Sequence, residues 1–240
     1  MGDVGDINGD GRSELVVGGT RGNQGVSGYA RIFSGMDGSI LYEFTGAAND
    51  DEFGRACAGV GDVNKDGVPD IIVGAIQRNT GGGYARVFSG ADGAVLYTFF
   101  GQVATDRFGN SVDGVGDMDG DGYADVVVGA PSPDPVFPVA GAKAREKSGL
   151  PGYARVFSGR TGEILMEVST TASKDGLGVS VSGAGDLNGD AVPDFIAGAW
   201  QDQNGLPGFA RVYAGERPAP PGCAPVNVTT SALGVAAFAA

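Results

Sequence analysis

The sequence predicts an all-β protein, a β-propeller built of about four four-stranded blades, and three observations support this fold class. A short acidic loop returns at spacings of 56, 55 and 69 residues, with its leading aspartate at Asp6, Asp62, Asp117 and Asp186. A second marker, Gly-Tyr-Ala-Arg-(Ile/Val)-Phe-Ser-Gly, follows each loop and starts at Gly28, Gly83, Gly152 and, as the variant GFARVYAG, Gly208. Glycine makes up 45 of the 240 residues without a Gly-x-y period, which indicates frequent tight turns and excludes collagen.

Each repeat contains four predicted strands, which are clearest in the second copy. Phe53–Val60 is the first strand, and the acidic loop follows it. Ile71–Ile76 is an apolar run rich in β-branched residues, as expected for a strand buried on both faces. Tyr84–Ser89 alternates between two faces, and the turn Ser89–Gly93 leads to the fourth strand, Val95–Phe100. The matching first strands start at Phe108 and Leu177, and the matching second strands start at Leu15, Val126 and Phe195.

Such a sheet cannot bury both faces alone, so the blades are expected to stack around an axis. An aromatic residue at the start of each third strand is predicted to fill the space between blades; these are Tyr29, Tyr84, Tyr153 and Phe209. An arginine two residues later is predicted to form an inter-blade ion pair or to stack on a neighbouring tyrosine; these are Arg31, Arg86, Arg155 and Arg211.

The repeats are predicted to occupy residues 1–215, and a Pro/Ala-rich tail occupies 216–240. The first repeat has no predicted first strand, and the last has no clear fourth strand after Gly215. Residues 233–239 are a candidate closing strand for the first blade, but a loose tail of small residues is the favoured interpretation. One insertion of about 13 residues lies between Asp125 and Tyr153. A closed four-bladed ring, part of a larger propeller and an assembly of chains all agree with these repeats.

The acidic loop has the composition of a calcium site. Oxygen-bearing side chains stand at positions 1, 3, 5 and 9, and the residue at position 7 is predicted to give its backbone carbonyl. The candidate ligands are Asp6, Asn8, Asp10, Arg12 and Glu14 in the first loop; Asp62, Asn64, Asp66, Val68 and Asp70 in the second; Asp117, Asp119, Asp121, Tyr123 and Asp125 in the third; and Asp186, Asn188, Asp190, Val192 and Asp194 in the fourth. Up to four Ca²⁺ ions are therefore expected, one in each loop.

Two alternatives to this interpretation can be weighed from the residues. An EF-hand needs a glutamate at position 12 and flanking helices, but Val17, Val73, Val128 and Ala197 occupy that position and strands follow. A turn without metal would also favour Asp, Asn and Gly, although four copies in register favour calcium. The third loop, with four carboxylates, is predicted to bind best. The fourth is the weakest, because Ala191 replaces the position-6 glycine.

These motifs resemble a known family. Phe53-Gly54 and Phe108-Gly109, the loop Gly-Asp-x-(Asn/Asp)-x-Asp-Gly-x-x-Asp and the following Val-Gly-Ala are similar to FG-GAP repeats, which form the calcium-binding β-propeller of integrin α chains and of many bacterial extracellular proteins. The resemblance covers about residues 1–215 and implies calcium at Asp62, Asn64, Asp66 and Asp70 and at the matching positions. Such propellers usually have seven blades, and Leu177-Gly178 departs from the Phe-Gly pattern in the last repeat.

The composition of the chain argues against several classes of partner and of catalytic or metal site. A net charge of −13 argues against nucleic acid and anionic membrane as partners. The absence of histidine removes histidine-based catalysis and histidine-ligated zinc. No apolar run is long enough for membrane insertion. An extracellular or cell-surface location is expected, and the export signal that this location requires is not present in this chain. Cys57 and Cys223 could form a disulfide or remain thiols.

A protein or glycan ligand is expected at the loops between the second and third strands, which carry amides, arginines and Trp200. These loops span residues 20–27, 77–82, 131–151 and 200–207, and the third also carries Lys143, Arg145 and Lys147. The leading functional prediction is a calcium-stabilised extracellular binding or adhesion module without catalysis. A lectin-like propeller and a non-catalytic repeat region of a larger secreted enzyme are the alternatives.

Overall fold

The regular elements of the chain are β-strands throughout the part that the computed structural model describes. That part covers residues 1–20, 25–77, 81–103, 106–131, 151–170, 175–200, 207–216 and 235–237. The first sheet contains β1 (Gly2–Asp3), β2 (Leu15–Gly19), β3 (Tyr29–Phe33) and β4 (Ile40–Thr45). The second contains β5 (Ala56–Gly61), β6 (Asp70–Ala75), β7 (Tyr84–Phe88) and β8 (Val95–Phe100). The third contains β9 (Ser111–Gly116), β10 (Asp125–Ala130), β11 (Tyr153–Phe157) and β12 (Ile164–Ser169), and the fourth contains β13 (Ser180–Gly185), β14 (Asp194–Ala199), β15 (Phe209–Tyr213) and β16 (Val235–Ala237).

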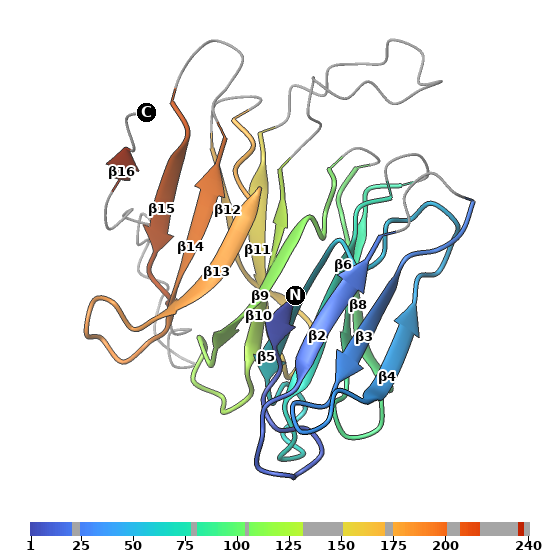
Figure 1. Ribbon diagram of the computed structural model, residues 1–240. Helices are drawn as coiled ribbons and strands as arrows, with labels where there is room; N and C mark the ends of the chain where they lie inside the picture. The colour runs from blue at the N-terminus through green and yellow to red at the C-terminus, as the bar shows by residue number, and fades with distance from the viewer. Residues whose placement is uncertain are drawn as a thin grey trace.

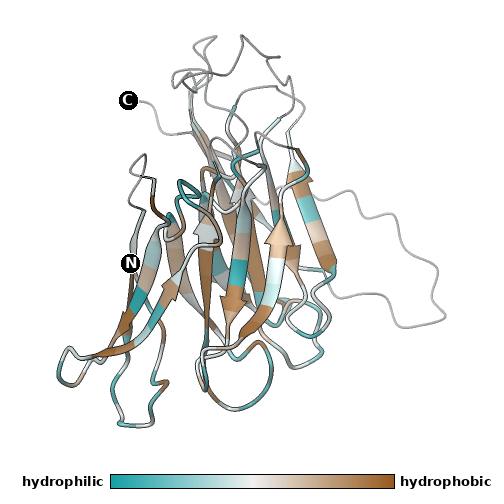
Figure 2. Cartoon of the chain, turned by 90° about the vertical axis from the view of Figure 1, so that its right-hand side faces the viewer, coloured by the Kyte–Doolittle hydropathy of each residue, from teal (hydrophilic) through white to brown (hydrophobic). Residues whose placement is uncertain are grey.

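Each sheet is an antiparallel meander in chain order, and each is one propeller blade, which confirms the predicted fold class. The innermost strands of successive sheets pack side by side, β1 on β5, β5 on β9 and β9 on β13. Figure 1 shows the four sheets fanning out in chain order, with the first sheet at one end and the fourth at the other. Figure 2 shows that hydrophobic residues are concentrated along the strands.

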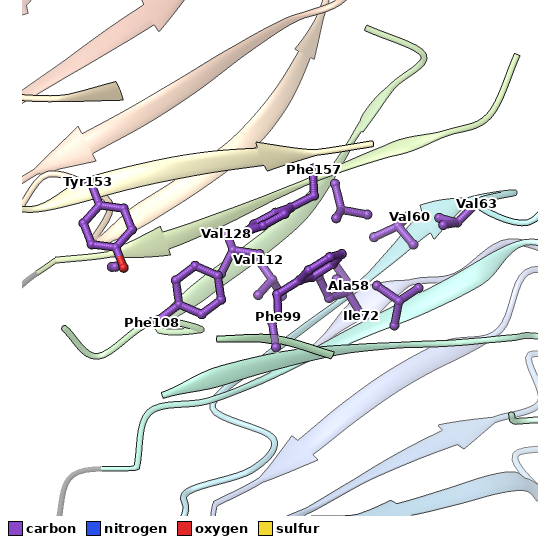
Figure 3. Close-up of a cluster of buried hydrophobic side chains, with 14 residues drawn as sticks. Ala58, Val60, Val63, Ile72, Phe99, Phe108, Val112, Val128, Tyr153 and Phe157 are labelled. Carbon is purple, nitrogen blue, oxygen red and sulfur yellow. The ribbon is translucent and has the colours of Figure 1, made fainter. Parts of the chain in front are cut away.

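Close approach between sheets requires glycine in the second strand. A Cβ on Gly18 would overlap the carbonyl oxygen of Gly54 in the next sheet, and Gly74 meets Gly109 in the same way. Aromatic rings fill the remaining space: Phe44 of the first sheet stacks on Phe88 of the second with centroids 4.0 Å apart. The cluster between the second and third sheets repeats this arrangement around Phe99, Phe108 and Phe157 (Figure 3). Burial of these rings is the main stabilising contribution at each junction.

The predicted inter-blade role is confirmed for Tyr84 and Tyr153, each of which also donates a hydrogen bond to a buried carboxylate, whereas Tyr29 is only half-buried. Tyr84 is 2% exposed, and its hydroxyl donates to Asp51 Oδ2 at 2.6 Å. Tyr153 donates to Asp106 in the same way at 2.7 Å. Burial, and then the hydrogen bond to Asp51, raise the pKa of Tyr84 well above its usual range.

The fourth sheet lacks this link. Phe209 occupies the position of Tyr84 and Tyr153 and has no hydroxyl group. Asp175, the counterpart of Asp51, is 5% exposed, and its Oδ2 has no hydrogen-bond partner among the described residues. A buried acceptor without a partner destabilises the fold, so this junction is weaker than the two before it.

Two expectations about the first and last repeats need correction. The first sheet does contain a short inner strand, since Gly2 and Asp3 pair with Val16 and Leu15. Residues 235–237 do not close the first blade; they pair with β15 and supply the outer strand of the fourth sheet, because Ala237 lies opposite Phe209 and Val235 opposite Arg211. The remaining residues of the predicted tail strand lie outside the described part of the chain.

The arginine prediction is partly wrong. The stacking is confirmed, but on the aromatic residue of the same strand: Arg155 Cζ lies 4.9 Å from the centroid of the Tyr153 ring. The ion pairs lie within a sheet rather than between blades, because Arg155 Nε contacts Glu167 across β11 and β12 at 2.6 Å. Cys57 is buried and carries a free thiol, and Cys223 lies outside the described residues.

Phe209→Tyr is expected to stabilise the protein by about 1 kcal/mol, because the added hydroxyl can donate to Oδ2 of Asp175, the oxygen that has no partner among the described residues. The measurement is urea unfolding of both proteins under the same conditions. Tyr84→Phe is the matched control and is expected to lose about 1–3 kcal/mol by leaving Asp51 short of a donor. A destabilising Phe209→Tyr would show that the fourth junction is built differently from the others.

Candidate metal centres

The four acidic loops share one backbone conformation, which the leading aspartate holds. In the third loop, Asp117 Oδ1 accepts from the amides of Gly120 and Asp121 at 2.7 and 3.0 Å, and its Oδ2 accepts from Gly122 at 2.8 Å. Asp6, Asp62 and Asp186 accept corresponding bonds in their own loops. The aspartate therefore folds the loop around its own carboxylate, as short polar side chains do in turns.

The residue at position 6 of each loop adopts a left-handed backbone, which explains why glycine is usual there. Gly11, Gly67 and Gly122 have φ angles of 86°, 88° and 87°. Ala191 takes the same conformation with a φ of 64°, at a cost of about 1 kcal/mol relative to glycine. The substitution that marked the fourth loop as the weakest site thus leaves the loop shape intact and adds strain.

The carboxylate at position 9 ties the loop to the turn between the third and fourth strands. Asp125 is 0% exposed; its Oδ2 accepts from Met118 N at 2.8 Å and its Oδ1 from Gly159 N at 2.9 Å. Asp70 makes the same pair of bonds to Val63 and Gly90. Asp194 repeats the arrangement in the fourth loop. These aspartates act as buried clamps in addition to any role toward a metal.

The first loop differs because its position-9 residue is a glutamate. Glu14 is 2% exposed, and its Oε2 accepts from Ile7 N at 2.7 Å. Its Oε1 is buried and has no hydrogen-bond partner among the described residues. A buried carboxylate with one unpaired oxygen, in a side chain that converges with two other acidic side chains, is costly unless a cation balances it, so Glu14 fits a metal ligand.

Carboxylates converge most closely in the first and third loops. Ligand atoms of Asp6, Asp10 and Glu14 lie within 4.8 Å of one another. The same holds for Asp117, Asp119 and Asp125. The donor set in both loops consists of oxygen atoms alone, which suits a hard cation such as Ca²⁺ rather than zinc or copper.

The side chains at positions 3 and 5 interact with each other. Asn64 donates to Asp66 Oδ2 at 2.8 Å, and Asn8 and Asn188 donate to Asp10 and Asp190 in the same way. The position-7 residue donates its amide to the position-5 carboxylate, as Val68 does to Asp66 Oδ1 at 2.8 Å. The predicted carbonyl ligands at position 7, which are Arg12, Val68, Tyr123 and Val192, remain predictions.

Burial shifts the acidity of two clamp residues. Desolvation raises the pKa of Asp70 to about 6, against the opposing effect of the hydrogen bonds from Gly90 and Val63. Burial likewise raises the pKa of Asp125 to about 6. Removal of these carboxylates from water disfavours their ionised form, and a bound cation would restore it.

Sequence reasoning missed two contributors to these centres. The amides of Gly90, Gly159 and Gly215 complete the clamps, although these glycines stand in a turn well beyond each loop. Lys65 of the second loop reaches the third, where its Nζ lies 5.1 Å from the centroid of the Tyr123 ring. The sequence signal for this contact was Lys65 itself, because the other three loops have glycine at the same position.

Most of the proposed partner-binding loops lie outside the described residues, including 21–24, 78–80, 132–150 and 201–206. Lys143, Arg145 and Lys147 fall in this part. Trp200 is described and is half-buried, and a Cβ on Gly176 would overlap its indole ring. Trp200 therefore packs on the backbone of its own sheet, while the glycan-binding alternative stays an untested prediction.

No helix in the described residues could cross a bilayer.

Comparison with known proteins gives consistent matches. Residues 108–144 match the FG-GAP repeat model, and residues 6–73 match the FG-GAP-like repeat model. Integrin alpha-8 of Mus musculus is 32% identical over 213 residues, and integrin alpha-5 of Xenopus laevis is 29% identical over 216 residues. Each alignment covers 82% of this chain and 19% of the relative, so the chain spans about a fifth of the length of these relatives.

Two solved structures are similar at low sequence identity. The Dos1 propeller is 11% identical, with a TM-score of 0.44 over 84% of this chain and 54% of that chain. The rhamnogalacturonan lyase PL11 of Bacillus licheniformis is 17% identical, with a TM-score of 0.39 over 80% of this chain and 41% of that chain.

Asp125→Ala is expected to destabilise the protein by roughly 2–4 kcal/mol even in the presence of a chelator, because it leaves two buried amides without an acceptor. Asp119→Ala in the same loop is the control, since this residue is half-buried and accepts only the Asp121 amide. Its loss is expected to stay below about 1 kcal/mol in chelator. Equal losses in chelator, measured by urea unfolding, would contradict a separate clamp role for Asp125.

Proposed function

Because the chain belongs to the integrin-like FG-GAP repeat family, we propose that it is a calcium-stabilised binding or adhesion module without catalytic activity of its own. Its place of action is extracellular or at a cell surface, where calcium is plentiful enough for sites of this kind. The metal ligands are the residues at positions 1, 3, 5 and 9 of each loop, together with the carbonyl at position 7.

The observation that best supports this proposal is the arrangement of carboxylates in the first loop. Three acidic side chains each place one carboxylate oxygen within 4.8 Å of the others, and one oxygen of Glu14, Oε1, is buried without a hydrogen-bond partner among the described residues. Such an arrangement is unfavourable in the absence of a positive charge, because like charges repel and a desolvated oxygen lacks compensation. A calcium ion would satisfy all three carboxylates, and its binding free energy would add to the stability of the folded chain.

The partner is proposed to be a protein ligand, on the ground that the repeats resemble those of integrin α chains. The calcium ions hold the acidic loops and, through the clamps, the ends of the strands. The rigid sheets then present the loops between the second and third strands as the contact surface, in the way that scaffolds commonly present binding loops.

Calcium titration of the chelator-treated protein by calorimetry, with thermal melting alongside, tests the proposal. About four equivalents are expected to bind, and the melting temperature is expected to rise clearly. Mg²⁺ should produce a smaller rise, because it demands a smaller, octahedral site. If Ca²⁺ neither binds nor shifts melting, the acidic loops are structural turns and the proposed function fails.

Calcium affinity is expected to fall as the pH decreases, because protons compete for Asp70 and Asp125, whose pKa values are about 6. Only about a tenth of such a carboxylate is ionised at pH 5, so affinity at each of these sites should be about tenfold weaker than at pH 7. Calorimetry at both pH values and constant ionic strength measures this change.

The raised pKa of Asp70 also affects the calcium-free protein, whose stability should fall as the pH increases, whereas calcium affinity should rise. The folded pKa of Asp70 lies above its reference value of 3.8, so its contribution to stability is fully present below about pH 4 and is lost as the pH rises through about 6. The stability of the protein in chelator should therefore decrease over this window, whereas the calcium-loaded protein should not follow it. Identical pH profiles with and without calcium would contradict a ligand role for these residues.

A further inference from the structure

The second and third acidic loops are joined more closely than the other neighbouring loops. At the first junction Gly5 lies against the ring of Pro69, and at the last junction Gly116 lies against the ring of Pro193. Between the second and third loops, the amide of Ala124 instead donates to the carbonyl oxygen of Asp62 at 3.1 Å. Asp62 is the leading residue of the second loop, so this bond runs directly between two candidate metal centres.

The residue at position 8 explains why this hydrogen bond occurs at one junction. The second and fourth loops have proline there, at Pro69 and Pro193, and proline has no amide hydrogen to donate. The third loop has Ala124 at the same position. Of the three neighbouring pairs among the four described loops, only the second and third can therefore be linked by this backbone bond.

A lysine side chain makes a second connection. Position 4 is Gly9, Gly120 and Gly189 in three loops, with φ angles of 77°, 79° and 80°, whereas Lys65 takes this left-handed conformation with a φ of 63°. Side chains are unfavourable in this conformation by about 1–2 kcal/mol. Lys65 Nζ lies over the ring of Tyr123, and a Cβ on Gly122 would be 2.6 Å from that nitrogen.

Tyr123 is held from a second direction as well. Arg160, in the turn of the third sheet, places its Cζ 5.7 Å from the centroid of the same ring. Tyr123 stands at position 7, whose carbonyl is a candidate ligand, and a ring between two cations has a restricted orientation. The second loop thus contacts the third at two adjacent residues, Tyr123 and Ala124.

We infer that the second and third loops form one cooperative calcium-binding unit, in which occupancy of the second loop raises the affinity of the third. This inference rests on the proposed function. Ordering of the second loop fixes Asp62 and Lys65, and their contacts fix Ala124 and Tyr123 before the third loop takes its ion. The third loop then loses less conformational freedom on binding, and thermodynamic linkage makes the effect reciprocal.

Tyr123 allows the third loop to be observed separately. It is the only aromatic residue in residues 6–14, 62–70, 117–125 and 186–194, so Tb³⁺ bound in place of Ca²⁺ in the third loop should emit when tyrosine is excited. Asp66→Ala removes the position-5 carboxylate of the second loop. Asp190→Ala removes the same carboxylate from the fourth loop, which adjoins the third on its other side, and is the matched control.

Asp66→Ala is expected to weaken Tb³⁺ binding at the third loop about fivefold, a typical size for coupling between sites. Asp190→Ala is expected to change it by less than about twofold. Competition with Ca²⁺ should give the same ranking. An unchanged or tighter third site in Asp66→Ala would overturn the inference, and so would equal effects of the two variants.

A second variant tests the contacts themselves. Lys65→Gly together with Ala124→Pro gives the second and third loops the residues that the sister loops already carry at these positions, so the loop conformation should be retained. In this background, Asp66→Ala should no longer affect the third loop. Persistence of the fivefold effect would show that other contacts carry the coupling.

The inference and the proposed function fail in different ways. Absence of sensitised emission and of calorimetric heat in the unaltered chain would overturn both. Binding at the third loop with no response to Asp66→Ala would leave the calcium-stabilised module intact and overturn only the cooperative unit. Thermal melting of each variant in chelator shows whether the chain is folded before titration.

Discussion

The buried carboxylate at the end of each acidic loop is the constraint on which the repeat depends. It accepts a hydrogen bond from the start of its own loop and, in the last three repeats, one from the turn beyond the third strand. A single side chain therefore holds two loops of one sheet together without water. Its burial raises the pKa where Asp70 and Asp125 occupy the position, so the same group that stabilises the loop geometry also favours a compensating cation.

Much of this architecture could be predicted from the sequence because the repeat combines several independent signals. The apolar run at Ile71–Ile76, the alternation at Tyr84–Ser89 and the turn that follows correspond to β6, β7 and the connection to β8. In the first and third loops, three of the expected carboxylates lie within 4.8 Å of one another because one short loop carries them. Spacing within nine residues is sufficient to place such a set, since the loop folds around its leading aspartate.

Features that depend on contacts between distant segments could not be predicted in this way. The pairing of residues 235–237 with β15 reflects an open sheet edge that needed a partner, and its amino-acid sequence carries no register signal. The tyrosine-to-aspartate link joins Tyr84 to Asp51 across 33 residues, and only the fold brings them together. Glu14 illustrates the same limit, because the sequence predicts a ligand but not that one of its oxygens is buried without a donor.

The fourth repeat departs from the pattern at several places that meet in the structure. Phe209 lacks the hydroxyl of its counterparts, Leu177 replaces phenylalanine, and Ala191 replaces the glycine of the loop. Among the described residues, the buried Oδ2 of Asp175 has no hydrogen-bond partner. The first two changes remove contacts that the preceding sheets contain and the third adds backbone strain, so the fourth sheet is expected to open first when the chain unfolds.

The clamps also separate two properties of each loop, its backbone conformation and its affinity for a cation. Asp194 holds the fourth loop by accepting from two backbone amides, so part of what holds that loop in shape comes from the chain itself rather than from an ion. A repeat can therefore gain or lose affinity through changes at its exposed positions while its sheet remains folded. During evolution, the number of bound ions can therefore change one blade at a time while every intermediate sequence still folds.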